Sequence, residues 1–391
     1  MITFLSRAKE IFPYTRDLRR DFHRHPELGF QEQRTSQVIS RELEKLPGIK
    51  VRTGLAETGV VGLLKGGSPG RTVLLRFDMD ALPITEETGA PYASENPGLM
   101  HACGHDGHLA IGLTTARMLH QDREGLSGQV KFVFQPAEEG LGGAERMIAE
   151  GVLENPRPDV NLALHLWNEK PLGWFAISDG PLMAASDRFN IVIQGKGGHG
   201  AKPHEAADPV VAAAAVISAL QTIVSREVHP LESGVITVST VEAGQAHNVI
   251  PGKVVCTGTL RSFTPEIREL LLRRCNEVVS GVSQVFRCQG DFRVLESTPA
   301  VVNHAQLAAE LRATAGELFP EMEIAATYRT MVSEDMALMM HDIPSCYCLI
   351  GSGNPDRGLT ARHHQPDFDF DERALSHGAA LLTAAVNRLL G

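Results

Sequence analysis

Apolar and polar positions follow two different periods along the chain, and the period distinguishes predicted strands from predicted helices. Residues 72–77 form a short apolar run typical of a buried strand, whereas 109–121 repeats its apolar residues with helical spacing. Further strands are predicted at 59–66, 128–135, 160–167 and 345–353, and further helices at 5–22 with a disturbance at Pro13, 36–46, 142–151 and 372–390. Alternation of strands and helices predicts an α/β fold, in which helices pack on the faces of a sheet.

The pattern changes around Ser186, where alternating strands replace the apolar runs. Between 186 and 299 the predicted order is strand, helix, strand, strand, helix, strand, which is the ferredoxin-like plan. Asp208 and Pro209 supply an N-cap and a first helical position for the Ala-rich helix of this region. Helix and strand alternation resumes after it. We therefore expect a main domain made of 1–185 and 300–391, with an α+β domain at 186–299 inserted into it.

Composition excludes several classes of protein. A formal net charge of −10 without a basic stripe argues against a nucleic-acid partner. The six cysteines are scattered and do not suggest a disulfide framework, which favours a reducing compartment. Residues 1–20 lack the apolar core of a signal peptide, and the longest apolar run, 210–220, is about half of a membrane span. We expect a cytoplasmic protein that does not bind a membrane.

Ligand-type side chains crowd the stretch 101–108. Cys103 and His105 lie two residues apart, and Asp106 and His108 follow directly. A thiolate and an imidazole at this spacing can bind one metal ion or two adjacent ions. The alternative is a buried thiol beside solvated histidines, the more common situation for an isolated Cys-x-His. Distant segments must therefore supply further ligands if this stretch binds metal.

Four further segments place acids or histidines at or near the ends of predicted strands. In open α/β sheets the carboxyl ends of the strands are where sites are built, so we expect these side chains to converge on Cys103 and His105. They are Asp78 and Asp80, Glu138 and Glu139, His165, and one of His363 or His364. The combined set exceeds what one tetrahedral ion needs and suits two ions that share a bridging ligand and a water.

The consecutive glutamates Glu138 and Glu139 can divide two roles. Metal ligation lowers the basicity of a carboxylate, so one glutamate would bind metal and the other would accept a proton from the attacking water. The alternative is a solvated helix start, where acidic residues are favoured by the helix dipole.

Seven motifs along nearly the whole chain resemble one known family. They are DMDALP, MHACGHDGH, QPAEEG, GKGGHGAKPH, NVIP, GTLR and HHQPDF, in this order. Together they resemble the M20 metallopeptidase family, and most of all its amidohydrolase branch of aminoacylases, hippurate hydrolases and indole-acetyl-amino-acid hydrolases. The resemblance implies a mixed-sheet catalytic domain with an inserted lid through which the proteins often form homodimers. This agrees with the order of elements predicted above.

The resemblance also assigns residues in the main domain. It implies two divalent ions, zinc or manganese, with cobalt and nickel also compatible. It places Glu138 at the general acid/base position and Asp80 at that of a helper aspartate. Most M20 peptidases have His-x-Asp where this chain has Asp78-Met79-Asp80, so a ligand histidine is absent and the role of Asp80 stays open. The implied metal ligands are Cys103, His105, Glu139, His165 and His364, the last preferred over His363 because it directly precedes the x-P-x-F pattern.

In the inserted domain, His199 resembles the lid histidine that approaches the scissile carbonyl, often from the partner subunit. Asn248 and Arg261 resemble the residues that hold the substrate's carboxylate, a task that suits a bidentate arginine. The alternatives are a glycine-rich turn, an Asn turn residue and a surface arginine. His204 and the pair Glu334 and Asp335 also match family patterns but receive no role.

The sequence thus predicts hydrolysis of an N-acyl amino acid to a carboxylic acid and a free amino acid. A water that bridges the ions would attack the amide carbon, with Glu138 as general acid and base. A dipeptidase or carboxypeptidase on the same centre is the first alternative, and a non-catalytic metal-binding relative is the second. His23 and His25 lie in a predicted turn without an acidic neighbour in sequence, so we predict structural roles for them.

Overall fold

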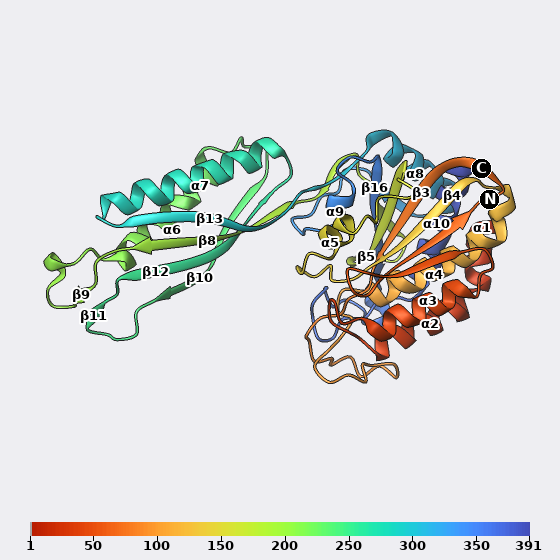
Figure 1. The fold of residues 1–391 in the computed structure, drawn as a ribbon, viewed down its shortest axis with the longest axis horizontal. Helices are drawn as coiled ribbons and strands as arrows, with labels where there is room; N and C mark the ends of the chain where they lie inside the picture. The colour runs from red at the N-terminus through yellow and green to blue at the C-terminus, as the bar shows by residue number, and fades with distance from the viewer. Residues whose placement is uncertain (1) are drawn as a thin grey trace. The chain divides into compact units, whose positions relative to one another are not determined.

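The computed structural model describes residues 2–391, which form two compact units (Figure 1). Unit 1 consists of the described residues up to Gly180 together with Val302–Tyr328 and Asp335–Gly391. Unit 2 consists of Pro181–Val301 and Arg329–Glu334. The short second segment of unit 2 has no signal in the hydrophobic pattern, because it contains neither a predicted helix nor a predicted strand.

Unit 1 is built on a mixed eight-stranded sheet with the order β1-β2-β4-β3-β5-β16-β6-β15. The four neighbours β4, β3, β5 and β16 are parallel, so their carboxyl ends meet at one edge. Buried on both faces, parallel strands show continuous apolar runs, and this explains the pattern of 72–77. The strands are β1 Lys50–Leu55, β2 Gly59–Lys65, β3 Ser68–Asp78, β4 Ser127–Gln135, β5 Val160–Pro171, β6 Trp174–Ala176, β15 Glu323–Ala325 and β16 Ser345–Gly353.

Helices cover this sheet, and α4 sets the position of the site. It is buried along most of its length, and Gly112 lets it lie directly against Phe77 and Phe134. A Cβ at Gly112 would come within 2.8 Å of the Phe77 ring, so the close approach requires glycine. The helices are α1 Ile2–Glu10, α2 Phe12–Arg24, α3 Gln33–Glu44, α4 His105–Asp122, α5 Gly143–Ala149, α8 Ala305–Leu318, α9 Met336–Met339 and α10 Arg373–Leu390.

The predicted helix 5–22 is two helices, α1 and α2, that separate at Ile11. Pro13 lies in the first turn of α2, where a missing N–H costs nothing because the group has no intrahelical partner. The predicted turn around His23 is also wrong. His23 belongs to the last turn of α2 and is buried.

Unit 2 has the predicted α+β plan. Its antiparallel sheet has the order β10-β12-β8-β13, the ferredoxin-like order, and α6 and α7 cover one face (Figure 1). Asp208 and Thr264 cap these two helices through hydrogen bonds from Val210 and Ile267 N–H. The elements are β8 Ala185–Gln194, β9 Gly198–His199, α6 Pro209–Arg226, β10 Gly234–Ala243, β11 Val249–Ile250, β12 Lys253–Ser262, α7 Pro265–Val285 and β13 Gln289–Thr298. The short strands β7 Gly180–Met183 and β14 Val301–Asn303 each begin in one unit and end in the other.

The helix α6 contains the apolar run 210–220. Within the part of the chain that the structure describes, it alone is long and apolar enough to cross a membrane by length and composition. A single helix of this kind is weak evidence, because core helices meet the same criterion. The buried face of α6 packs in the core of unit 2 through residues such as Val216, Leu220 and Ile223.

Candidate metal centre

Three buried side chains from two distant segments of unit 1 form the first ligand group. Cys103 lies just before α4, His105 is its first residue, and His165 lies in β5. Gly104 between the first two has a φ of 85°, which allows the chain to reverse direction there. The Sγ atom of Cys103 lies 3.6 Å from Nε2 of His165, and one ligand atom from each of the three residues lies within 4.8 Å of the others.

Two further groups overlap with the first. Cys103, Glu139 and His364 form one, and His105, Glu138 and Glu139 form the other, again with ligand atoms within 4.8 Å of one another. All five predicted ligands therefore meet in one place. Cys103, His105 and Glu139 each belong to two of the three groups, so the groups overlap.

His364 reaches this place through an unusual backbone conformation. Its φ is 66°, in the left-handed region that few residues other than glycine adopt. A hydrogen bond of 2.8 Å from its N–H to the carbonyl oxygen of Ala102 holds the turn. The ring then places Nε2 3.2 Å from Oε1 of Glu139, although the side chain is 52% exposed. Strained conformations of this kind are concentrated at functional sites.

The polar atoms that face this centre fit divalent cations. The Nδ1–H of His105 donates to the main-chain oxygen of Asp80 at 2.9 Å, so Nε2 is the ring nitrogen that remains for a metal ion. That Nε2 atom, Oδ1 of Asp80 and Oε1 of Glu139 are buried and have no hydrogen-bond partner, although Oδ1 of Asp80 lies 3.3 Å from Nδ1 of His105 and Oε1 of Glu139 lies 3.2 Å from Nε2 of His364. Buried acceptors without a partner are rare, and a bound cation satisfies them. Thiolate, imidazole and carboxylate together suit zinc and its first-row neighbours.

Without a bound cation, the surroundings of Cys103 disfavour its thiolate, which is the form that binds a metal ion. Burial and the nearby Glu139 and Glu138 carboxylates raise the pKa of the Cys103 thiol well above its ordinary value. Burial also lowers the pKa of His165 well below its ordinary value, so this ring is neutral. A divalent ion at this place would supply the positive charge that stabilises a thiolate.

Asp80 supports two of the ligands. Its Oδ2 atom accepts a hydrogen bond of 2.9 Å from the N–H of Glu139, and its main-chain oxygen holds His105. Asp80 therefore joins the ligand segment after β4 to the start of α4. Glu138 is half-buried beside this contact, in the same group as His105 and Glu139.

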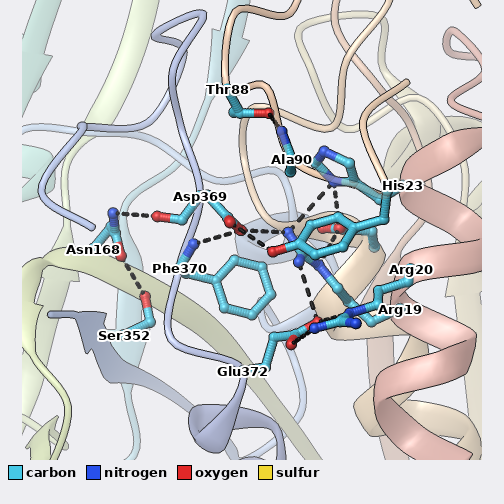
Figure 2. A network of polar contacts seen from close by, with 12 residues as sticks. Arg19, Arg20, His23, Thr88, Ala90, Asn168, Ser352, Asp369, Phe370 and Glu372 are labelled. Carbon is cyan, nitrogen blue, oxygen red and sulfur yellow. Dashed lines mark hydrogen bonds and ion pairs between the residues drawn. The ribbon is translucent and has the colours of Figure 1, made fainter. Parts of the chain in front are cut away.

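A second buried network, which was not predicted, surrounds Arg19 of α2 (Figure 2). Arg19 of α2 is fully buried, and its Nε donates to Oδ2 of Asp106 at 2.7 Å. The same guanidinium pairs with Asp369 at 2.8 Å and with Glu372 at 3.3 Å. His23 also bonds to Asp106, at 2.7 Å. The network thus ties α2 and the start of α4 to the segment that follows His364.

No local pattern could have revealed this network. Arg19 and Asp106 are 87 residues apart, and Arg19 and Asp369 are 350 residues apart. The predicted structural role of His23 agrees with its place here, but its acidic partners come from elsewhere in the chain.

In unit 2 the structure brings His199 and Asn248 together but not Arg261. His199 in β9 pairs with Val249 in β11, and Gly200 N–H donates to the Asn248 carbonyl at 2.8 Å. Arg261 lies near the far end of β12, about 26 Å along the strand from its start at Lys253. Its Nη1 atom is buried and has no hydrogen-bond partner.

The sequence matches the family described as peptidase family M20/M25/M40 over residues 74–388. It is 40% identical to IAA-amino acid hydrolase ILR1-like 5 of Arabidopsis thaliana, over 99% of this chain and 89% of that protein. It is 37% identical to N-acetyl-L-cysteine deacetylase of Bacillus subtilis, over 95% of this chain and 87% of that protein. The structure superimposes on the Bacillus subtilis YXEP protein, a dinuclear metal-binding peptidase of the M20 family, with a TM-score of 0.86, 34% identity, and coverage of 98% of this chain and 99% of that one.

Proposed function

Because the chain belongs to peptidase family M20/M25/M40, we propose that this amide-bond hydrolase cleaves N-acyl amino acids to a carboxylic acid and a free amino acid. The observation that carries the proposal is the meeting of Cys103, His105, Glu139, His165 and His364 beside Glu138. The two relatives support the substrate class, because their names describe an amino acid conjugate and an acetylated amino acid.

The ligand groups would hold two divalent ions, which when bound polarise an amide carbonyl and lower the pKa of a water molecule. Glu138 accepts the proton of the attacking water and passes it to the leaving nitrogen, a role that typically contributes a factor of about 10² to 10⁴ in rate. Asp80 keeps Glu139 and His105 in place during this transfer. We propose zinc or manganese as the native metal, with cobalt and nickel compatible with the same donors.

The test is a hydrolysis assay with acetyl, benzoyl and indole-acetyl amino acids, combined with metal analysis of the same sample. Release of the free amino acid that requires divalent metal supports the proposal. A metal-loaded protein that cleaves none of these amides contradicts it.

A peptidase is the second candidate, because the structurally similar YXEP protein is described as a peptidase. The substrates differ in the amino group, which is free in a dipeptide and acylated in the first proposal. Comparing kcat/KM for a dipeptide with that for its N-acetylated amino acid counterpart separates the two. A higher value for the free dipeptide would favour the peptidase.

We further propose that the protein acts as a homodimer through unit 2. The positions of Asn248 and Arg261 support this. Asn248 lies just before β11, ahead of the start of β12, whereas Arg261 lies about 26 Å along β12 from Lys253, so one substrate carboxylate cannot reach both residues within a single unit 2. Mixing inactive His199→Ala and Glu138→Gln proteins tests it. Activity that returns on mixing indicates sites that combine residues from two subunits, and no return contradicts such sharing.

A further inference from the structure

A continuous chain of buried hydrogen bonds connects the ligand segments beneath the proposed metal centre. None of its side chains is an assigned metal ligand, and no residue in it is more than 7% exposed. We call it the buried polar chain. Its members, in order, are Gln135, Asp335, Arg76, Asp78, His108 and the main chain of Leu166.

The first half of the buried polar chain holds the segment that carries Glu138 and Glu139. Asp335 accepts hydrogen bonds from Gln135 Nε2 at 2.8 Å and from Ala144 N–H at 3.0 Å. These two residues lie on either side of the glutamates, at the end of β4 and in the first turn of α5. Arg76 donates to Asp335 at 2.9 Å and to Asp78 at 2.7 Å.

The second half fixes the tautomer of His108. Its Nδ1–H donates to Oδ1 of Asp78 at 2.5 Å, and its Nε2 accepts the N–H of Leu166 at 2.9 Å. Since both ring nitrogens are engaged, His108 is not available as a metal ligand, although it lies beside His105 and Asp78. Asp78 is likewise engaged, because its two oxygens accept from Arg76 and His108.

The Leu166 peptide needs these partners because of where β3 ends. The pairing of β5 with β3 stops at Ala163, while its pairing with β16 continues past Leu166. The Leu166 N–H on the β3 side would otherwise be a buried donor without an acceptor. The carbonyl oxygen of the same residue accepts from His165 Nδ1 at 2.6 Å and from His363 Nε2 at 2.9 Å.

We propose that His108, held by Asp78, is a positioning residue that fixes the Leu166 peptide and through it the orientation of the ligand His165 and of His363 beside the ligand His364. The inference rests on the proposed metal centre. For a purely structural role it would be enough that the Leu166 N–H has a hydrogen-bond acceptor. The buried charges of Arg76 and Asp78 would not be needed for stability, because replacing a buried ion pair by apolar residues of similar volume is often neutral or stabilising. Side chains that orient ligand histidines typically change metal affinity by about 10- to 100-fold when they are removed.

Two substitutions test the hydrogen bonds of the two ring nitrogens of His108 separately. In His108→Asn the amide lies at the level of Nδ1, so it can bond to Asp78 but cannot reach the Leu166 N–H. In His108→Gln the side-chain oxygen lies at the level of Nε2 and can accept that N–H. His377→Gln is the matched control, because His377 is a buried histidine of the same unit that is not part of the buried polar chain.

The measurement is titration of metal-free protein with Co²⁺ in the presence of a competing chelator, together with the visible spectrum of the bound ion. We expect His108→Asn to weaken Co²⁺ binding by about 10- to 100-fold and to shift the spectrum, and His108→Gln to recover most of the loss. The control should bind as the unaltered protein does. Equal affinities for the Asn variant and the unaltered protein, or equal losses in both His108 variants, would overturn the proposal.

A measurement on the unaltered protein covers the case in which a variant does not fold. The ¹⁵N shifts of His108 should show a protonated Nδ1 and an unprotonated Nε2, and a protonated Nε2 would overturn the proposal. The outcomes also separate the two proposals. Metal binding that responds to His108 without hydrolysis of any N-acyl amino acid rejects the substrate assignment alone, whereas an unaltered protein that binds no divalent metal rejects both.

Discussion

The sulfur of Cys103 lies 3.6 Å from Nε2 of His165, although the two residues are 62 positions apart in the sequence. One comes from the turn before α4 and the other from the parallel strand β5. Their contact brings the turn before α4 and the edge of the sheet together in the candidate metal centre.

Replacing Cys103 with Ala should remove a donor shared by two ligand groups. We expect a loss of metal affinity of at least about 100-fold, more than the loss of a side chain that only supports a ligand. Metal content after dialysis, measured by mass spectrometry, checks this. Cys346→Ala, also a buried thiol of unit 1, is the control. Equal metal content in the two variants would contradict the role of Cys103.

Removing the metal from the unaltered protein with a chelator should abolish amide hydrolysis, because the polarised carbonyl and the acidified water both depend on the ions. Adding back zinc, manganese, cobalt or nickel one at a time should restore it to different extents. Full hydrolysis by metal-free protein would be incompatible with the proposed chemistry.

Glu138→Gln should keep the metal but lower kcat by about 10²- to 10⁴-fold, because the amide cannot accept the proton of the attacking water. Glu145→Gln, at an exposed position in the nearby helix α5, should leave kcat unchanged. Steady-state kinetics with metal analysis check both variants. An active Glu138→Gln enzyme would remove Glu138 from the acid/base role.

Arg19→Met should destabilise the protein by about 3–5 kcal/mol, because it leaves the fully buried Asp106 without its main cationic partner. Arg16→Met on the same helix breaks only an exposed pair with Asp17 and should cost less than about 1 kcal/mol. Chemical denaturation measures both. Similar losses in the two variants would show that the buried network contributes little.

His377 should make the protein acid-sensitive. Burial lowers the pKa of this histidine from 6.5 to about 4, so the folded state keeps it neutral while the unfolded state takes up a proton. Its contribution is therefore fully present above pH 6.5 and is lost as the pH falls through 4, amounting to about 3 kcal/mol. Unfolding free energies of His377→Gln should fall less between these pH values. Parallel pH profiles for the two proteins would contradict this assignment.

The sequence by itself determined the class of fold and the chemistry of the candidate site. Strands buried on both faces are continuously apolar, and helices repeat every 3.6 residues, so the order of elements in both units follows from local periodicity. Ordered motifs of Cys, His and Glu at strand ends likewise indicated which side chains meet, because parallel strands end at one edge.

Only the tertiary structure decided which side chains support that site. Asp78 accepts hydrogen bonds from Arg76 and His108, and His108 in turn accepts one from the Leu166 N–H. Asp106 forms an ion pair with Arg19. The left-handed turn at His364 and the place where β3 stops pairing with β5 are also properties of the assembled sheet. Buried polar atoms take their partners from whichever segment lies nearest in space, and no local pattern of residues encodes that proximity.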